Sequence, residues 1–157
     1  MARFGSKGKR KQPRTTKYSE EELRERLTEA QYRVTQGGET EAPYSGSLRE
    51  VEETGTYRCR VCNAALFSSD TKFDPNGAWP AFKAPISDEA VGKQTDWGFG
   101  IPRTESVCAD CGAHLGHVFP EGQGGTDTRY CINSASLTFE ESKEEPSDRL
   151  EDEESQD

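Results

Sequence analysis

The hydrophobic and polar positions along the chain predict two short helices followed by a series of short strands. Residues 19–22 and 28–31 each begin with Ser or Thr and end three positions later with Glu or Gln, the pattern that caps a helix N-terminus. The first helix is expected to end near Arg26, and the second before a turn at residues 37–38. Beyond this turn, residues 39–55 show no strong period and predict a loop with short strand fragments.

From residue 55 onward, brief runs of apolar and β-branched residues are separated by Gly, Pro, Asn and Asp, which is typical of strands. The expected strands are residues 56–60, 65–68, 97–101, 118–119 and 129–139. Short strands at this spacing, after a helical start, predict an all-β domain preceded by a small helical segment.

The two ends of the chain differ sharply in charge. Residues 1–18 contain seven Lys or Arg and no acidic residue, whereas residues 140–157 contain ten acidic residues against Lys143 and Arg149. Of the formal net charge of −9, these ends contribute +7 and −8, which leaves −8 for residues 19–139. Such polar ends are typical of solvated tails. The basic residues 9–11 could also be a targeting signal or a weak anion-binding arm.

The resulting expectation is one domain at residues 18–140 between disordered tails at 1–17 and 141–157. Because the domain is acidic, it would repel phosphate backbones, which argues against nucleic acid as a partner. No apolar run approaches the length of a membrane span, and the start lacks the apolar segment of a signal peptide. The glycine-rich residues 120–128 lack the Lys-Ser/Thr ending of a phosphate-binding loop and are expected to form a flexible rim. We expect a cytoplasmic monomer without a membrane partner.

Four of the five cysteines form two Cys-x-x-Cys pairs, Cys59 with Cys62 and Cys108 with Cys111. Each pair is followed by a residue that tolerates a positive φ, Asn63 or Gly112, as a metal-binding knuckle requires. Four thiolates suit the closed tetrahedral site of structural zinc, so we expect one zinc ion per chain. Disulfides and a thioredoxin-type dithiol are the alternatives, but the second needs a βαβ context that the sequence lacks.

His114 and His117 are the only histidines, and both follow the second cysteine pair directly. They could instead bind the metal together with Cys108 and Cys111, but that arrangement would leave the first cysteine pair without a role. A lone histidine is usually structural. Two within four residues, in a chain with an unpaired cysteine, favour a functional role, because imidazole titrates near neutral pH.

Cys131 is the cysteine that remains when the other four are paired. It lies within the expected strand 129–139, where alternation would place Arg129, Cys131 and Asn133 on one face. The guanidinium would favour the thiolate, and the amide could hydrogen-bond to a substrate, so Cys131 is a candidate nucleophile. A small buried cysteine without chemistry is the alternative.

Several motifs together resemble a known family. Residues 112–120 (Gly-Ala-His-Leu-Gly-His-Val-Phe-Pro) and 129–134 (Arg-Tyr-Cys-Ile-Asn-Ser) are similar to the signature of the B-type peptide methionine sulfoxide reductases, the MsrB family. Residues 71–74, followed by Trp-Pro at 79–80, resemble its tryptophan-bearing segment, and residues 19–46 resemble its N-terminal part. The resemblance covers roughly residues 18–140.

This resemblance implies a fold, a metal and a reaction. The fold would consist of coiled antiparallel β-sheets with N-terminal helices, and zinc would be bound by the four paired cysteines. The reaction would be thiol-dependent reduction of methionine-R-sulfoxide, free or in oxidised proteins and peptides. Trp79 would accommodate the substrate's methyl group, although core packing is the alternative for this side chain. Cys131 would be the nucleophile, surrounded by His114, His117, Asn133 and Arg129.

The chain departs from the family pattern in two places. Residues 98–101 read Gly-Phe-Gly-Ile where the family usually carries a stretch like Ser-His-Gly-Met, which would alter the rim of the pocket. Many relatives also carry a second, resolving cysteine shortly before the tryptophan, and here Gly77 stands near that place. With four of five cysteines on the metal, none remains to resolve a Cys131 sulfenic acid. An external thiol, such as thioredoxin, glutathione or glutaredoxin, is therefore the expected reductant.

Two rival interpretations stay open at this point. One is a zinc-binding interaction module of the same fold that lacks catalysis, which would need neither the spare cysteine nor the histidine pair. The other is reduction of the S epimer, which an unrelated type of enzyme performs. A turnover assay resolved by epimer separates all three.

Overall fold

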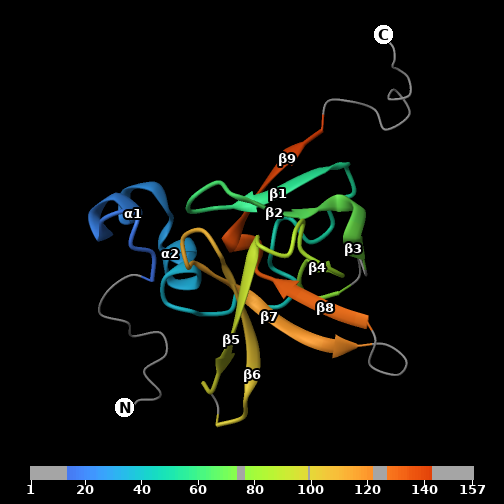
Figure 1. Ribbon diagram of the computed structural model, residues 1–157. Helices are drawn as coiled ribbons and strands as arrows, with labels where there is room; N and C mark the ends of the chain where they lie inside the picture. Colours follow the sequence, from blue (N-terminus) through green and yellow to red (C-terminus); the bar gives the residue numbers. More distant parts are fainter. Residues whose placement is uncertain (1–13, 74–76, 99, 122–126, 143–157) are drawn as a thin grey trace.

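The computed structural model describes residues 14–73, 77–98, 100–121 and 127–142 (Figure 1). Two short α-helices come first, α1 (Glu20–Arg26) and α2 (Glu29–Thr35). The strands follow as β1 (Gly55–Cys59), β2 (Ala65–Ser68), β3 (Lys72–Phe73), β4 (Ala81–Phe82), β5 (Val91–Asp96), β6 (Arg103–Cys108), β7 (His114–Glu121), β8 (Asp127–Ile132) and β9 (Leu137–Glu141). Two 3₁₀ turns, η2 (Ser69–Thr71) and η4 (Ser134–Ser136), connect strands.

Both helices begin with the predicted capping box. At α1, the Ser19 hydroxyl accepts from the Glu22 backbone N–H at 3.1 Å, and the Glu22 carboxylate accepts from the Ser19 N–H at 2.9 Å. Thr28 and Gln31 repeat this exchange at α2. Each box satisfies two backbone donors that a helix start leaves unpaired, so helices of seven residues are held at their N-termini.

The strands form two antiparallel sheets that share one apolar core. One has the order β2-β1-β9, and the other has the order β3-β4-β8-β7-β6-β5. Phe67 from β2 stacks on Phe82 from β4 with ring centroids 4.4 Å apart, and Tyr57 from β1 meets the same ring at 5.0 Å. β8 leads through η4 directly into β9, so one continuous segment joins the two sheets (Figure 1).

The predicted mainly β class with N-terminal helices is confirmed, and the expected strands at 56–60 and 65–68 agree with β1 and β2. The strand expected at 97–101 is wrong, because its described residues form the turn between β5 and β6. The strand expected at 129–139 is interrupted by η4, and residues 39–54 contain no strand. The sequence did not indicate β5 and β6 because their central residues are polar, so neither strand contains an apolar run.

The domain begins earlier than residue 18. Arg14 forms an ion pair with Glu105 at 2.8 Å, and the Thr15 N–H donates to the Gln36 side chain at 2.9 Å. Residues 14–17 are therefore not part of a free tail, which corrects the expected boundary. Residues 1–13, residues 143–157 and most of the expected flexible rim, residues 122–126, lie outside the described residues. No described helix combines the length and apolar character needed to cross a bilayer.

Candidate active site and metal centre

A small cavity of about 80 Å³ opens where β7 and β8 lie side by side. Four of the predicted site residues line this cavity: Cys131, His117, Asn133 and Trp79. The cavity is lined by Thr40, Trp79, Arg103, Gly116, His117, Phe119, Cys131 and Asn133. The structure thus assembles residues that are up to 93 positions apart in the chain.

Strand pairing brings Cys131 to His117. The two residues are direct partners in the antiparallel β7–β8 ladder, so their side chains project to the same face. The neighbouring Gly116 has no room for a side chain, because a Cβ atom there would lie 1.9 Å from the Cys131 carbonyl oxygen. Glycine at this position therefore lets the two strands approach closely beside the half-buried thiol.

A carboxylate that the sequence did not single out supports His117. Asp96, the last residue of β5, is buried, and its Oδ2 lies 2.8 Å from His117 Nε2. Arg103 contacts the same oxygen at 3.3 Å, and the Gly98 N–H donates to Oδ1 at 2.8 Å. Because an ionised carboxylate only accepts, Nε2 carries the proton in this contact.

His114 packs against His117 but does not line the cavity. It is fully buried, its Nδ1 lies 2.5 Å from a Glu105 oxygen, and its Nε2 has no hydrogen-bond partner among the described residues. Burial lowers the pKa of His114, which favours the neutral ring. Burial alone would raise the pKa of Glu105, but His114 and Arg14 outweigh it and lower that pKa to about 2. His114 therefore donates to an anionic Glu105 and packs 5.5 Å from the His117 ring.

Glu41, also unforeseen, joins the cavity's two walls. Its carboxylate accepts from the backbone N–H groups of Ser134 and Ala135 at 2.7 and 3.0 Å, directly after the strand that carries Cys131. Its own N–H donates to Asn133 Oδ1 at 2.9 Å, and its carbonyl accepts from Trp79 Nε1 at 3.1 Å. Glu41 thus fixes the aromatic wall and the turn after the thiol with respect to each other.

The Asn133 side chain is held on both of its polar atoms. Its Oδ1 accepts from Glu41, and its Nδ2 donates to the Leu115 carbonyl at 2.9 Å. A primary amide has two N–H donors, so one of them is left for a bound group. Arg129 is not among the residues that line the cavity, and its guanidinium lies 4.8 Å from the centre of the Phe73 ring.

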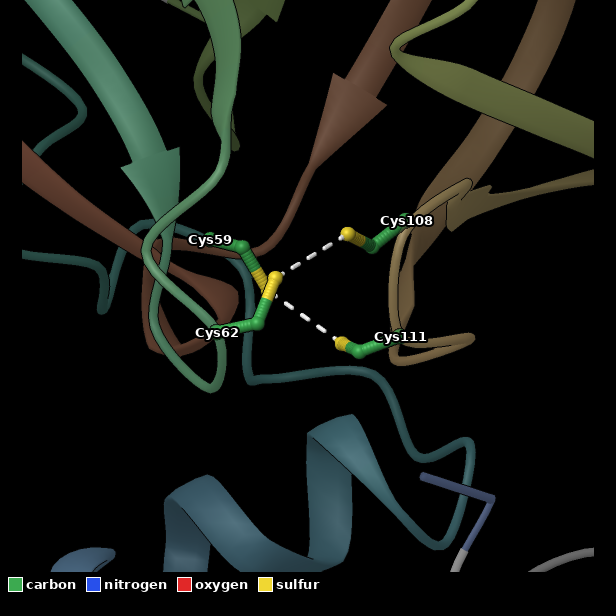
Figure 2. Close-up of side chains that lie close together, drawn as sticks. All are labelled: Cys59, Cys62, Cys108 and Cys111. Carbon is green, nitrogen blue, oxygen red and sulfur yellow. Dashed lines mark hydrogen bonds between the residues drawn. The ribbon is translucent and has the colours of Figure 1, made fainter. Parts of the chain in front are cut away.

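The four paired cysteines form a separate cluster between the two sheets (Figure 2). Cys59 ends β1 and Cys108 ends β6, so each sheet contributes one pair. The sulfurs of Cys59 and Cys111 are 3.7 Å apart, those of Cys62 and Cys108 are 3.6 Å apart, and all four lie within 4.8 Å of one another. A tetrahedral ion with metal–sulfur bonds of about 2.3 Å requires sulfurs roughly 3.8 Å apart, so the cluster is close enough to bind a metal ion.

Both cysteine pairs adopt the predicted knuckle. Asn63 and Gly112 have φ of 72° and 85°, and their N–H groups donate to the carbonyls of Cys59 and Cys108 at 2.8 Å. Hydrogen bonds from neighbouring thiols lower the pKa of Cys62, and they lower that of Cys111 to about 4. Thiols that compete in this way for protons form a donor set that suits a soft divalent cation.

Comparison with known proteins agrees with this geometry. Residues 27–141 match the SelR domain family. Over 122 residues, 78% of this chain, the sequence is 48% identical to the peptide methionine sulfoxide reductase MsrB of Leptospira interrogans, of which the match covers 93%. The chain belongs to the MsrB family. The predicted family resemblance is thereby confirmed.

A second relative is longer than this chain. The sequence is 49% identical to the mitochondrial methionine-R-sulfoxide reductase B3 of Mus musculus, again over 122 residues. The match covers 48% of that protein, so this chain spans about half its length. Membership of the MsrB family therefore concerns the domain that both relatives share.

Proposed function

We propose that this protein reduces methionine-R-sulfoxide in oxidised proteins and peptides, with Cys131 as the nucleophile. One observation carries the proposal: Cys131 and His117 are paired across β7 and β8 at a cavity that Trp79 also lines. The names of both relatives specify methionine sulfoxide reduction, and one specifies the R epimer. A binding module of the same fold would have no use for a spare thiol opposite a histidine.

In the proposed reaction, the Cys131 thiolate attacks the sulfoxide sulfur. The sulfoxide oxygen must gain a proton as this bond forms, and His117 Nδ1 is the group that we propose supplies it. The protonated oxygen then passes from the substrate sulfur to the Cys131 sulfur, as the bond between the two sulfurs and the substrate S–O bond break. The products are the methionine thioether and a cysteine sulfenic acid, so the substrate is reduced by two electrons and the cysteine is oxidised by two.

The surrounding residues would prepare this step. Asp96 accepts from His117 Nε2 and would stabilise the ring while it carries a second proton. The free N–H of the Asn133 amide would hydrogen-bond to the sulfoxide oxygen, and Trp79 would contact the methyl group by dispersion. His114, packed behind His117, would maintain the position of that ring. For Arg129 we retain only the proposal that its positive charge favours the thiolate.

We propose zinc as the ion of the four-cysteine cluster, one per chain. Four thiolates form a closed site, and a closed site leaves no position for a substrate, so the ion would stabilise the fold. Because the cluster uses four of the five cysteines, regeneration of Cys131 would need an external thiol such as thioredoxin, glutathione or glutaredoxin. A reducing compartment such as the cytoplasm would supply these donors.

The test is reduction of a racemic peptide methionine sulfoxide with dithiothreitol, resolved by epimer on a chiral column. We expect loss of the R epimer alone in the presence of the protein, and no loss with the Cys131→Ser variant. Circular dichroism and metal content should be the same for both proteins. Absence of turnover would favour the binding module, and loss of the S epimer would contradict the stereochemical assignment.

A further inference from the structure

Three large apolar side chains are exposed on segments that lead directly to or from the cavity. Trp97 is 63% exposed, Ile101 is 66% exposed and Phe119 is 37% exposed. These are three of the five large hydrophobic residues that are exposed among the described residues. Large apolar side chains that gather at one place on a surface commonly mark a binding site, whereas scattered ones need no explanation.

The β5–β6 turn, of which residues 97, 98 and 100–102 are described, carries two of these side chains and continues directly from the active site. It begins after Asp96, whose carboxylate contacts His117, and it ends before Arg103, which lines the cavity. Asp96 and Arg103 are paired across the two strands, so the turn projects from that point. Phe119 lines the cavity itself, with its ring 6.5 Å from that of His117.

The size of the cavity explains why a surface outside it matters. Pockets that enclose a whole small molecule are typically about 300–1,000 Å³, whereas this one is about 80 Å³. Only the end of a methionine sulfoxide side chain would enter, and the residues on either side of it in a polypeptide would lie across the rim. Exposed aromatic and aliphatic side chains are the usual anchors for such contacts.

We propose that Trp97 and Ile101, together with Phe119, form an apolar lip that binds hydrophobic residues flanking the oxidised methionine in an extended polypeptide. The lip would select polypeptides with hydrophobic flanking residues over those with polar flanking residues. This inference rests on the proposed function, and it identifies a substrate class for the same site.

The experiment compares three substrates that share one methionine-R-sulfoxide: the N-acetyl amino acid amide, a nonapeptide with Leu and Phe on both sides, and a nonapeptide with Ser and Gly there. The double variant Trp97→Ser/Ile101→Ser is measured against the wild type. Phe119 is left intact because it lines the cavity. Ile86→Ser is the matched control, since Ile86 is 43% exposed on the segment after β4 and does not line the cavity.

For the wild type, kcat/KM should be highest for the apolar peptide. In the double variant, the ratio of kcat/KM for the apolar peptide to that for the amide should fall about tenfold or more, mainly through KM. The same ratio for the polar peptide should change less than threefold, and Ile86→Ser should leave both ratios as they are. The proposed lip would be contradicted if the double variant left the ratio for the apolar peptide unchanged, or if the ratios for both peptides fell equally.

A binding measurement separates this proposal from the proposed function. In the Cys131→Ser background, the Kd of the apolar peptide should rise about tenfold when Trp97 and Ile101 are replaced, whether or not the wild type turns over. A wild type that reduces none of the substrates would contradict the proposed function. Equal Kd values with and without the two side chains would contradict the proposed lip but not the proposed function.

Discussion

At the scale of single residues, the candidate site depends on what each neighbour leaves available. Asp96 Oδ2 contacts Nε2 of His117, while Glu41 and the Leu115 carbonyl hold Asn133 and leave one N–H. His114, by contrast, is fully buried with its Nδ1 on Glu105. Two histidines three positions apart therefore have different environments, and only His117 reaches the cavity.

Replacement of His117 by Ala should slow turnover by roughly 10²–10⁴-fold, because a positioned general acid typically contributes that much. Single-turnover rates with a peptide sulfoxide measure the effect on the chemical step. Asp96→Asn, which keeps the size of the side chain but loses the carboxylate, should retain more activity than His117→Ala. If His117→Ala kept most of its activity, the proton would have to come from another group or from water.

Recycling of Cys131 gives a second prediction at this scale. With excess sulfoxide and no reductant, the enzyme should stop after one turnover as a sulfenic acid. A sulfenic-acid trap followed by digestion under non-reducing conditions should give one adduct, on Cys131, with the other four thiols reduced. A disulfide between Cys131 and any cysteine of the cluster would instead mean that the metal site also serves as the resolving dithiol.

At the scale of elements, the loop after α2 positions the site as much as the strands do. Residues 39–46 carry no regular structure, yet Glu41 in this loop connects Trp79, Asn133 and the start of η4 through four hydrogen bonds. Burial raises the pKa of Glu41, and its two backbone donors oppose that rise by stabilising the charged form. The charged form is the one that can accept from both N–H groups at once.

Glu41→Gln should therefore lower both stability and kcat. The amide oxygen can accept from one of the two N–H groups, while its NH₂ group would face the other donor, at a cost of about 1.5–3 kcal/mol for a lost charge-assisted bond. We expect kcat to fall more than KM rises, because the turn after Cys131 would lose its position. Glu39→Gln is the control, since Glu39 pairs with Arg33 on the surface at 3.3 Å. Equal behaviour of the two variants in thermal melts and kinetics would argue against a positioning role for Glu41.

At the scale of the whole molecule, the cysteine cluster joins the two sheets. β1 belongs to the three-stranded sheet and β6 to the six-stranded sheet, and each ends in one cysteine pair. An ion bound by all four sulfurs would connect these ends, which lie 49 positions apart in the sequence at Cys59 and Cys108. The site with Cys131 and the cysteine cluster are thus two separate sites that the same two sheets support.

Cys108→Ser should disrupt the fold rather than the rate alone, because binding of a structural metal contributes directly to folding free energy. Elemental analysis of the wild type, purified without added metal, should give close to one zinc per chain. The variant should lose the metal and unfold at a lower temperature, as followed by circular dichroism, and a chelator should have a similar effect on the wild type. A wild type that is fully folded without metal would contradict this assignment.

The sequence by itself determined the features that depend on near neighbours. The capping boxes at Ser19 and Thr28 use residues three positions apart, and the knuckles use Asn63 and Gly112 next to their cysteines. Short apolar runs were enough to locate β1 and β2. The motifs around His117 and Cys131 identified the family, because resemblance to a family is a property of the sequence itself.

The tertiary structure alone decided which polar groups meet. Asp96, Arg103 and Glu41 carry no local pattern, and the polar strands β5 and β6 gave no apolar run, so strand pairing was needed to bring Asp96 to His117. It also buried His114 completely on Glu105, while His117 reaches the cavity. The physical reason is the separation along the sequence. Caps and knuckles form between residues close in the chain, whereas a buried carboxylate contacts its partner only after distant strands have paired.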